Sequence, residues 1–522
     1  MAEQRKVAGV KYTSAGQEYF ERRSLKRTAG VWGLWGLAVA AVISGDFSGW
    51  NFGVATAGFG GMAIAFIILV AMYYGLIFSI GEMAAAMPHT GGAYSFARSA
   101  MGPWGGLITG LAETIEYVAT TAVIVFFSAS YANGITSELL GFDLSDNMWI
   151  WWVALYVVFI ALNSAGASIS FKFAIVVSII SIGILVVFGV MALVTGSVDW
   201  GSLFNIAPDP AAVGSSTFLP GGPLAILFVL PFAMWFFLGI EELPLAAEES
   251  NNPTKDIPRA GFIARGTLIA TGILVLVLNT GVLGAEATGA SGEPLLDGFR
   301  AIVGDQVAAL LALFALVGLL ASLQGIMFAY GRNMYSLSRA GYYPKFFSLT
   351  GKRQTPWIAL IIGAAIGFVA LLVVDILSKT AEGAGGVAGA IVLNIAVWGA
   401  VFAYLMQMIA FILLRRRFPT ASRPYKSPWG VPGAVIAALI SAAIFVGLLV
   451  QEPYRIAIVA IVAVYILILI GFALYGRHRL VLSPEEEYAL SGGLHGDPQK
   501  EGYDAMEGDV PGTGAKGSPK KK

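Results

Sequence analysis

Carboxylates that interrupt apolar runs are the residues of this chain best suited to chemistry. Asp46 lies in residues 44–49, whose sequence Ser-Gly-Asp-Phe-Ser-Gly interrupts one such run. Glu241 and Glu242 interrupt another, directly after residues 235–240. Ionisable residues at membrane depth are costly and mark functional sites by default. We therefore predict that both segments contribute to one binding site for a small charged or polar ligand.

A further pair of carboxylates, Glu113 and Glu116, has an i, i+3 spacing. In a helix this spacing puts both side chains on one face. Together with Tyr117 they could line a cavity and relay protons, or they could make ordinary polar contacts between helices. The sequence leaves both interpretations open.

The composition excludes several classes of protein. Of 522 residues, 57% are hydrophobic and 12% are charged, whereas soluble domains have about 45–50% apolar and about 25% charged residues. The formal net charge is zero, which gives no reason to expect a nucleic-acid partner. With no cysteine and three scattered histidines, no metal or cofactor is expected. No nucleophile is paired with a base, so we do not expect an enzyme.

Long apolar runs predict an all-α polytopic membrane protein. A helix needs about 20 apolar residues to cross the hydrocarbon core, and lipid cannot satisfy an exposed backbone. The sequence predicts twelve transmembrane helices, near residues 31–55, 60–86, 104–136, 147–165, 172–195, 222–248, 262–285, 303–331, 357–377, 387–413, 431–450 and 454–475.

The basic residues predict the orientation of these helices. With both termini cytoplasmic, 29 of the 32 basic residues lie inside, and only Arg300, Lys379 and Arg455 lie outside. We expect an inner-membrane protein with a cytoplasmic tail at residues 1–29 and a transporter domain at 30–475. Residues 476–522 are polar and glycine-rich, which predicts a disordered cytoplasmic tail.

The two interrupted helices stand at equivalent positions. They open two blocks of five helices, at about 31–195 and 222–413, and leave two C-terminal helices at 431–475. Transporters built from inverted repeats bind substrate near the midplane, where two corresponding helices are broken. A broken helix with a carboxylate at the start of each block therefore predicts a secondary transporter.

Several motifs between residues 30 and 430 carry a family resemblance. They are Gly-Glu-Met-Ala-Ala-Ala-Met-Pro-His-Thr-Gly-Gly-Ala-Tyr at 81–94, Glu-Glu-Ser-Asn-Asn-Pro at 248–253 with Ile-Pro-Arg-Ala at 257–260, Arg-Asn-Met-Tyr through Ser-Arg-Ala-Gly at 332–341, and Arg-Pro-Tyr-Lys at 423–426. With them the chain resembles the amino acid–polyamine–organocation superfamily. Residues 43–51, Ile-Ser-Gly-Asp-Phe-Ser-Gly-Trp-Asn, resemble the ethanolamine permeases within it. The resemblance implies the five-plus-five inverted repeat of the bacterial leucine transporter.

The resemblance gives Asp46 a specific interpretation. Amino-acid members of the superfamily read Gly-Ser-Gly-Ile-Phe in the helix 1 break, where free backbone N–H groups receive the substrate carboxylate. Here Asp46 replaces the apolar residue, and a carboxylate would repel an anion and attract an ammonium. We therefore expect Asp46 to be the counter-ion of an amine that lacks a carboxylate. The alternative is that Asp46 caps the second half of the broken helix.

The expected substrate site combines the two breaks. It comprises Ser44, Gly45, Asp46, Phe47, Ser48, Trp235, Phe236, Leu238 and Gly239. Trp235 stands where arginine-exchanging relatives carry an aromatic gate, and a cation near an aromatic face gains about 0.5–2 kcal/mol. Core packing is the alternative role for this indole. Ser48 or Asn51 is expected to bind a substrate hydroxyl.

Ion coupling is expected to involve acidic residues. Glu241 aligns with a frequent acid of the family and, with Glu113 and Glu116, is expected to respond to protons. Some proton-coupled relatives carry a helix 5 lysine where this chain has Ser181, which is compatible instead with a sodium site, exchange or facilitated transport. The expected partners are the amine, a proton or sodium ion, and the lipid bilayer.

These features predict import of ethanolamine or another small cationic amine by alternating access. One alternative is an amino acid or polyamine permease or exchanger of the same fold. A carboxylate-bearing substrate would then need a cation, and no lysine or arginine is found in the central spans. The other alternative is a transport-like membrane sensor, which would need a structured tail.

Overall fold

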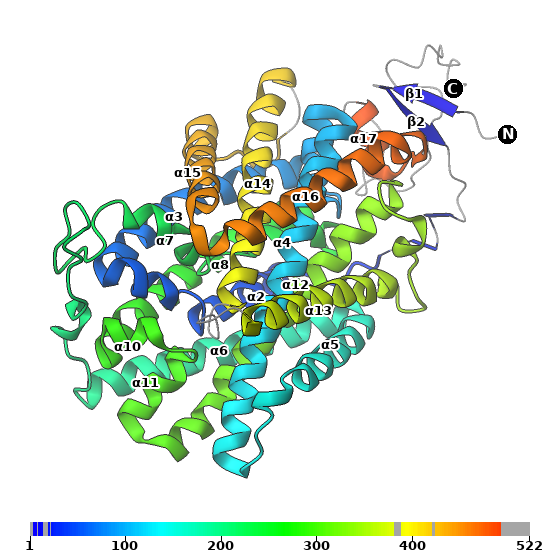
Figure 1. The fold of residues 1–522 in the computed structure, drawn as a ribbon. Coiled ribbons are helices and arrows are strands. Elements are labelled where there is room, and N and C mark those ends of the chain that lie inside the picture. The colour runs from blue at the N-terminus through cyan, green and yellow to red at the C-terminus, as the bar shows by residue number, and fades with distance from the viewer. Residues whose placement is uncertain are drawn as a thin grey trace.

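The computed structural model describes residues 4–7, 9–13, 19–20, 22–23, 25–380, 388–419 and 423–491. This part of the chain is almost entirely helical (Figure 1). Its long helices are α2 (Val31–Val42), α3 (Asn51–Ala86), α4 (Gly92–Leu140), α5 (Trp149–Ser164), α6 (Ala167–Val194), α7 (Ala225–Met234), α8 (Pro253–Leu274), α12 (Asp305–Arg339), α13 (Trp357–Thr380), α14 (Ala388–Arg417), α15 (Gly430–Val450) and α16 (Glu452–Leu474).

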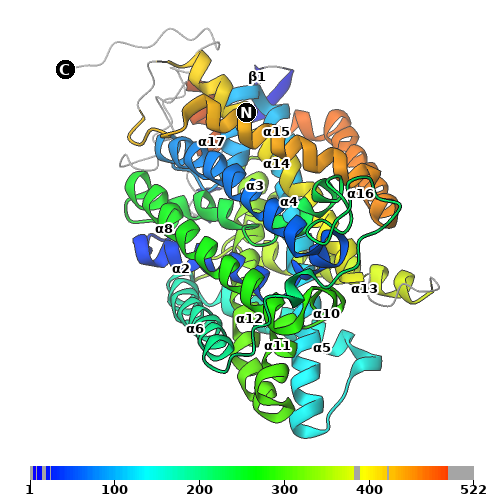
Figure 2. The same cartoon turned by 90° about the vertical axis from the view of Figure 1, so that its left-hand side faces the viewer.

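Shorter elements connect these helices. They are α9 (Thr280–Leu283), α10 (Ala285–Ala290), α11 (Pro294–Val303), the π-helical turn η5 (Val275–Asn279), and the 3-10 turns η2 (Ser145–Asn147), η3 (Ser202–Phe204), η6 (Lys345–Ser348) and η7 (Gly476–His478). Figure 2 shows α2 between α6 and α8, which it contacts along its length.

The described helices make the chain an all-helical, multi-pass membrane protein. Nine of them are long and apolar enough to cross a membrane, and three shorter apolar helices cover 31–46, 149–164 and 225–234. Helices occur in every predicted range, although α4 starts at Gly92 and bends at Gly102, ahead of Pro103. The count of twelve spans, the five-plus-five repeat and the orientation stay predictions.

Both predicted interruptions are breaks in helix geometry. α2 ends at Val42, and the 3-10 turn η1 (Ile43–Asp46) separates it from α3. α7 ends at Met234, and Gly239, with φ 109°, precedes the 3-10 segment η4 (Ile240–Glu249). Each break leaves backbone groups without the hydrogen bonds of a continuous helix, which makes them available to a ligand.

One end of the molecule, which we call the terminal face, is built from both ends of the chain (Figure 1). Strands β1 (Gln4–Val7) and β2 (Val10–Thr13) pair antiparallel, and β2 pairs parallel with β3 (Leu480–Val481). Helix α17 (Pro484–Ser491) follows β3. Helices α10 and α11 lie at the opposite end (Figures 1 and 2).

Residues 476–491 correct the prediction of a disordered C-terminal tail. Glu485 and Glu486 of α17 are buried, at 1% and 0% exposure, and they form ion pairs with Arg339 and Arg98. The sequence does contain a helix-start signal here, a proline followed by three glutamates, which the polar composition of the tail obscures. The rest of the predicted tail, residues 492–522, lies outside the described residues.

Candidate functional site

The two helix breaks are in direct contact. A Cβ atom added to Gly45 would lie 2.1 Å from the carbonyl oxygen of Trp235. Gly49 has φ 96°, and a Cβ there would lie 2.8 Å from Cδ1 of the Trp235 indole. Only glycine permits this approach, so the structure brings together the predicted segments 44–49 and 235–239.

Asp46 is a buried carboxylate without a hydrogen-bond partner. Its residue exposure is 1%, and within the described chain neither carboxylate oxygen accepts a hydrogen bond. Thr271 of α8 lies near, but its hydroxyl is within 3.3 Å of two carbonyls of its own helix. A buried acceptor left unpaired costs about 1–3 kcal/mol, and more for a charged group. A ligand that donates hydrogen bonds would remove this cost.

The capping alternative for Asp46 is not observed. The start of α3 has no side-chain cap. Instead, Oδ1 of Asn51 accepts the Gly49 N–H at 3.1 Å. The amide nitrogen of Asn51 donates to the carbonyls of Thr288 and Ser291, at 3.1 and 2.7 Å. These three contacts hold Asn51 to the protein's own backbone, and its binding of a substrate hydroxyl stays a prediction.

The backbone of the helix 1 break offers few free donors. The Ser44 N–H donates to Oγ of Ser322 at 2.8 Å, and the N–H groups of Phe47 and Ser48 donate to the Ser44 carbonyl at 3.0 and 3.2 Å. The Ser48 hydroxyl is buried without a partner in the described structure. It therefore stays a candidate for a ligand hydroxyl.

The acceptors around the break suit a cation. Within the described residues, no hydrogen bond is donated to the carbonyls of Trp235 or Phe236. Helices α2 and α7 both end at the break, and a helix C-terminus carries about half a negative charge. With Asp46 in the turn that follows α2, the site combines a carboxylate, free carbonyls and the negative ends of two helices.

The aromatic residues of the second break divide into two environments. Trp235 is 2% exposed, and its Nε1 has no partner among the described residues. The ring of Phe236 packs 5.6 Å from Trp50 and 5.2 Å from Phe66. The Phe236 ring therefore belongs to the core, and its contribution to a ligand is limited to its carbonyl. Leu238 is likewise buried at 3% exposure.

The predicted acids Glu113 and Glu116 of α4 lie near Glu241 of η4, which directly follows the second break. Glu113, Glu116 and Glu241 are 1%, 0% and 3% exposed, and Glu241 interacts electrostatically with both glutamates of α4. Oε2 of Glu241 accepts the Gly239 N–H at 3.1 Å. Glu242 is also buried, and neither of its oxygens has a partner within the described residues.

Polar residues from other helices complete this acid cluster, which we define as Glu113, Glu116, Glu241 and Glu242. Asn333 of α12 donates to Glu113 at 3.0 Å. Tyr404 of α14 donates to Glu116 at 3.4 Å and lies 3.3 Å from the hydroxyl of Tyr73. The spacing of Asn333, Tyr404 and Tyr73 along the chain gives no signal that they converge, so the sequence does not predict them as site residues.

Ser181 lies on the helix predicted to carry an ion site. It is fully buried, and its hydroxyl donates to the Val177 carbonyl of its own helix at 2.6 Å. Another serine of α6, Ser178, contacts α2: its hydroxyl donates to the Gly36 carbonyl at 3.0 Å. No group of three or more metal-binding side chains occurs in the described part of the chain.

The family-like motifs pair with one another near the terminal face. Glu82 lies 2.6 Å from Arg415 and 3.1 Å from Arg423. Glu249 lies 2.8 Å from Arg332, and Glu248 lies 2.6 Å from the Arg339 guanidinium. These motifs therefore hold the helix ends together, whereas within the described residues the carboxylates of the break and of the acid cluster form no ion pair, although Glu242 interacts electrostatically with Arg332.

Known proteins align with nearly the whole chain. The model of the family described as amino acid permease matches residues 33–482. An uncharacterized transporter of Rhizobium meliloti (strain 1021) is 26% identical over 83% of this chain and 89% of its own. A putative histidine permease of Bacillus subtilis (strain 168) is 25% identical over 84% of this chain and 90% of its own. The branched-chain amino acid permease BcaP of the same organism is 25% identical over 78% of this chain and 85% of its own.

Proposed function

The chain belongs to the amino acid permease family, and we propose that it is a secondary transporter of a small cationic amine, with ethanolamine as the first candidate. The observation that carries the substrate proposal is Asp46, whose buried carboxylate has no partner in the described structure. An ammonium can donate hydrogen bonds to this carboxylate and to the free carbonyls of the second break.

The state of the backbone supports a substrate without a carboxylate. A carboxylate would need free N–H groups, but those of Ser44, Phe47 and Ser48 already donate to protein oxygens. It would also lie near Asp46, and like charges at short range are strongly unfavourable in a low-dielectric site. The neutral hydroxyl of ethanolamine needs no free backbone N–H group and is not repelled by Asp46. It can form a hydrogen bond with the Ser48 hydroxyl, which has no partner in the described structure.

Transport follows in this proposal from alternating access. The ammonium binds Asp46, Trp235 covers it, and the helices that carry the two breaks rock against the others. Glu241 of the acid cluster directly follows the second break and accepts the Gly239 N–H, so in this proposal proton binding in the cluster responds to substrate occupancy. The terminal face, predicted to be cytoplasmic, is closed by the ion pairs of the motifs.

An amino acid is the second candidate substrate. Relatives are named as permeases for histidine and for branched-chain amino acids, which favours this class. The α-amino group would then bind Asp46, and the carboxylate would require backbone N–H groups of the first break to be released from their present acceptors. A transport-like sensor would need a structured tail, and the described part of the tail, residues 476–491, is structured and packs on the transporter's terminal face.

The experiment is uptake of labelled ethanolamine into proteoliposomes, with and without imposed pH or sodium gradients. Competition by choline, putrescine, histidine and branched-chain amino acids is measured alongside. We expect saturable uptake that small amines inhibit and zwitterions do not, and the gradient dependence identifies the coupling ion. Uptake of an amino acid without uptake of ethanolamine would overturn the amine proposal and establish the second candidate.

A further inference from the structure

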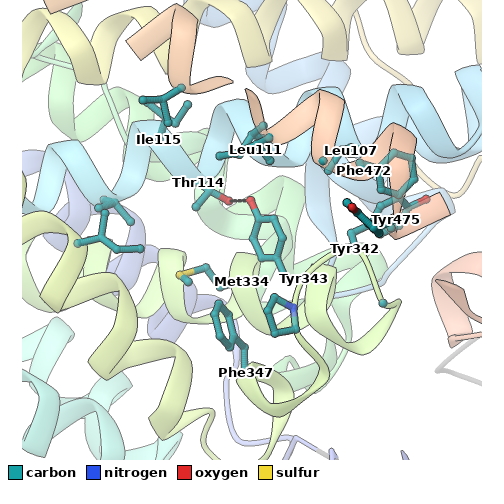
Figure 3. A pocket seen from close by; sticks show the side chains of 18 of the residues that line it. Leu107, Leu111, Thr114, Ile115, Met334, Tyr342, Tyr343, Phe347, Phe472 and Tyr475 are labelled. Atoms are coloured by element: carbon teal, nitrogen blue, oxygen red, sulfur yellow. Dashed lines mark hydrogen bonds between the residues drawn. The ribbon is translucent and has the colours of Figure 1, made fainter. Parts of the chain in front are cut away.

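A groove lies on the outer side of the helix bundle, between α4, α13 and α16 (Figure 3). Its volume is about 1020 Å³, and its walls are apolar. Leu111 and Ile115 of α4 form one wall, and Val464 and Ile468 of α16 form another. Val464 and Ile468 are 48% and 39% exposed, so the groove opens toward the surroundings of the bundle. We call it the α4–α16 groove.

Positive charge gathers where the α4–α16 groove reaches the terminal face. Lys345 and Arg479 line this end, and neither side chain has an ion-pair or hydrogen-bond partner among the described residues. Burial, followed by the nearby cations Arg23 and Arg479, lowers the pKa of Lys345. The protein therefore leaves the positive charge at this end of an apolar groove without compensation.

Exposed aromatic residues place this end at the membrane–water interface. Phe346, next to Lys345, is 52% exposed, and Tyr475 is 68% exposed. Aromatic residues of membrane proteins concentrate at the level of the lipid headgroups. On the orientation predicted from the basic residues, this interface is the cytoplasmic one, whose leaflet carries the negative surface potential.

We propose that the α4–α16 groove binds one anionic phospholipid, with an acyl chain between α4 and α16 and its headgroup on Lys345 and Arg479. Basic pockets between transmembrane helices on the cytoplasmic side bind acidic headgroups. A free anion would leave the apolar walls unfilled. A zwitterionic lipid would leave the two cations uncompensated.

This lipid site is connected to the acid cluster. The Thr114 hydroxyl in the groove wall lies 2.8 Å from that of Tyr343 (Figure 3). It also lies 2.9 Å from Oδ1 of Asn333. Asn333 in turn donates to Glu113 at 3.0 Å. A bound lipid would therefore fix the outer end of a hydrogen-bond chain that holds one of the buried glutamates.

The test measures lipid bound to the full-length protein in detergent, by native mass spectrometry with added phosphatidylglycerol or phosphatidylcholine. Lys345→Gln with Arg479→Gln removes the charges. Each basic residue near a membrane surface contributes about 1 kcal/mol to anionic-lipid binding, so the double variant should bind phosphatidylglycerol roughly 30-fold more weakly. The matched control is Lys172→Gln with Arg416→Gln, two exposed basic residues away from the groove.

A second variant tests the apolar part of the site. Gly471 lines the groove, and a Cβ at this position meets open space, so Gly471→Leu should fill the groove without disturbing the fold. Gly183 also faces open space but lies on α6, outside the groove, so Gly183→Leu is its control. Loss of phosphatidylglycerol binding in both groove variants and in neither control supports the proposal. Equal binding of the two lipids, or unchanged binding in the groove variants, overturns it.

A separate set of contacts carries a second inference, from the buried glutamates of α17. Glu486 accepts hydrogen bonds from the hydroxyls of Tyr12, Tyr94 and Tyr342, at 2.6, 2.5 and 3.0 Å, and it forms an ion pair with Arg98. Glu485 pairs with Arg339 and accepts the Ser336 hydroxyl at 2.8 Å.

These contacts connect α17 to elements that are far apart in the sequence. Arg98 and Tyr94 lie near the start of α4, and Arg339 is the last residue of α12. The Tyr488 hydroxyl donates to the carbonyl of Ala86, at the end of α3, at 2.6 Å. We infer that α17 is a lock that holds the terminal face closed and withdraws when that face opens, an inference that rests on the alternating access proposed above.

The test does not depend on the identity of the substrate. Because the chain has no cysteine, a single Ser95→Cys reports access from the terminal face through its rate of alkylation. Ser95 is 2% exposed and lies on α4 between Tyr94 and Arg98, which both contact Glu486 of α17. Glu485→Gln with Glu486→Gln should accelerate labelling about tenfold or more, because each change breaks a buried ion pair. Glu138→Gln with Glu286→Gln, two exposed acids away from this face, is the control.

A milder variant keeps the lock testable if the double variant does not fold. Tyr488→Phe retains the ring and removes the hydroxyl that donates to the Ala86 carbonyl, and it should give a smaller acceleration in the same direction. Labelling at control rates in the folded variants would overturn the lock. That outcome would leave the proposed substrate and site unaffected, because no transport is measured.

Discussion

Replacement of Asp46 by Asn separates a ligand role from a structural one. The substitution keeps the size of the side chain and removes its charge. Asp46 is 1% exposed, so water cannot take over the contact with an ammonium, and the energetics are those of a buried pair. Removing one partner of a buried pair costs about 3–5 kcal/mol. This corresponds to roughly a 150- to 5000-fold loss of ethanolamine affinity.

The same substitution should not weaken the substrate-free protein. In the described structure, neither oxygen of Asp46 accepts a hydrogen bond that Asn would lose, so the substitution removes only a buried charge with Thr271 nearby. We therefore expect the thermal stability of Asp46→Asn without ligand to equal or exceed that of the parent, while stabilisation by ethanolamine disappears.

Binding of labelled ethanolamine and thermal unfolding with and without ethanolamine measure both effects on one purified sample. Asp305→Asn, the same chemical change at an exposed position of α12, is the control. Affinity within threefold of the parent would refute the counter-ion reasoning. A clear loss of ligand-free stability would show that Asp46 has a structural partner in place of a substrate.

Three further changes test the geometry around this site. Gly45→Ala puts a Cβ 2.1 Å from the Trp235 carbonyl oxygen. Overpacking of this kind costs about 1–3 kcal/mol, so uptake should be lost. The control Gly183→Ala, whose Cβ meets open space, should leave uptake unchanged. Glu241→Gln should abolish uptake driven by a proton gradient but preserve ethanolamine binding; retained proton-driven uptake would exclude Glu241 as the coupling group. Burial raises the pKa of Glu293 to about 7, despite a hydrogen bond from Ser130 and the nearby Arg300. Because this carboxyl ionises at lower pH in the unfolded chain, its cost to folding grows as pH rises from about 4.5 through 7. Between pH 5 and pH 8, the free energy of unfolding of the parent should therefore fall by up to about 3 kcal/mol relative to that of Glu293→Gln. Parallel pH profiles of the two unfolding free energies would contradict this.

The sequence predicts this fold well where the signal is local and poorly where it depends on packing. The helix ranges and both breaks follow from apolar runs and glycine, because these properties act within a few residues. The ordered segment at 480–491 does not, since its buried glutamates Glu486 and Glu485 depend on Arg98 and Arg339, which lie 388 and 146 residues away along the chain. In the same way, the sequence makes both Asp46 and Asn51 candidate substrate ligands, and only the structure shows that Asn51 has hydrogen-bond partners within the protein while the Asp46 carboxylate has none among the described residues.

The buried carboxylates of this chain divide by their partners, and the division indicates their roles. Five near the terminal face contact an arginine: Glu82, Glu248, Glu249, Glu485 and Glu486. Those of the break and the acid cluster form no such ion pair in the described structure, although they are as deeply buried: Asp46, Glu113, Glu116, Glu241 and Glu242. Structural stability favours pairing every buried charge, because an isolated one costs several kcal/mol. The unpaired group therefore has the distribution expected of sites that receive their cation from outside, as substrate or as protons.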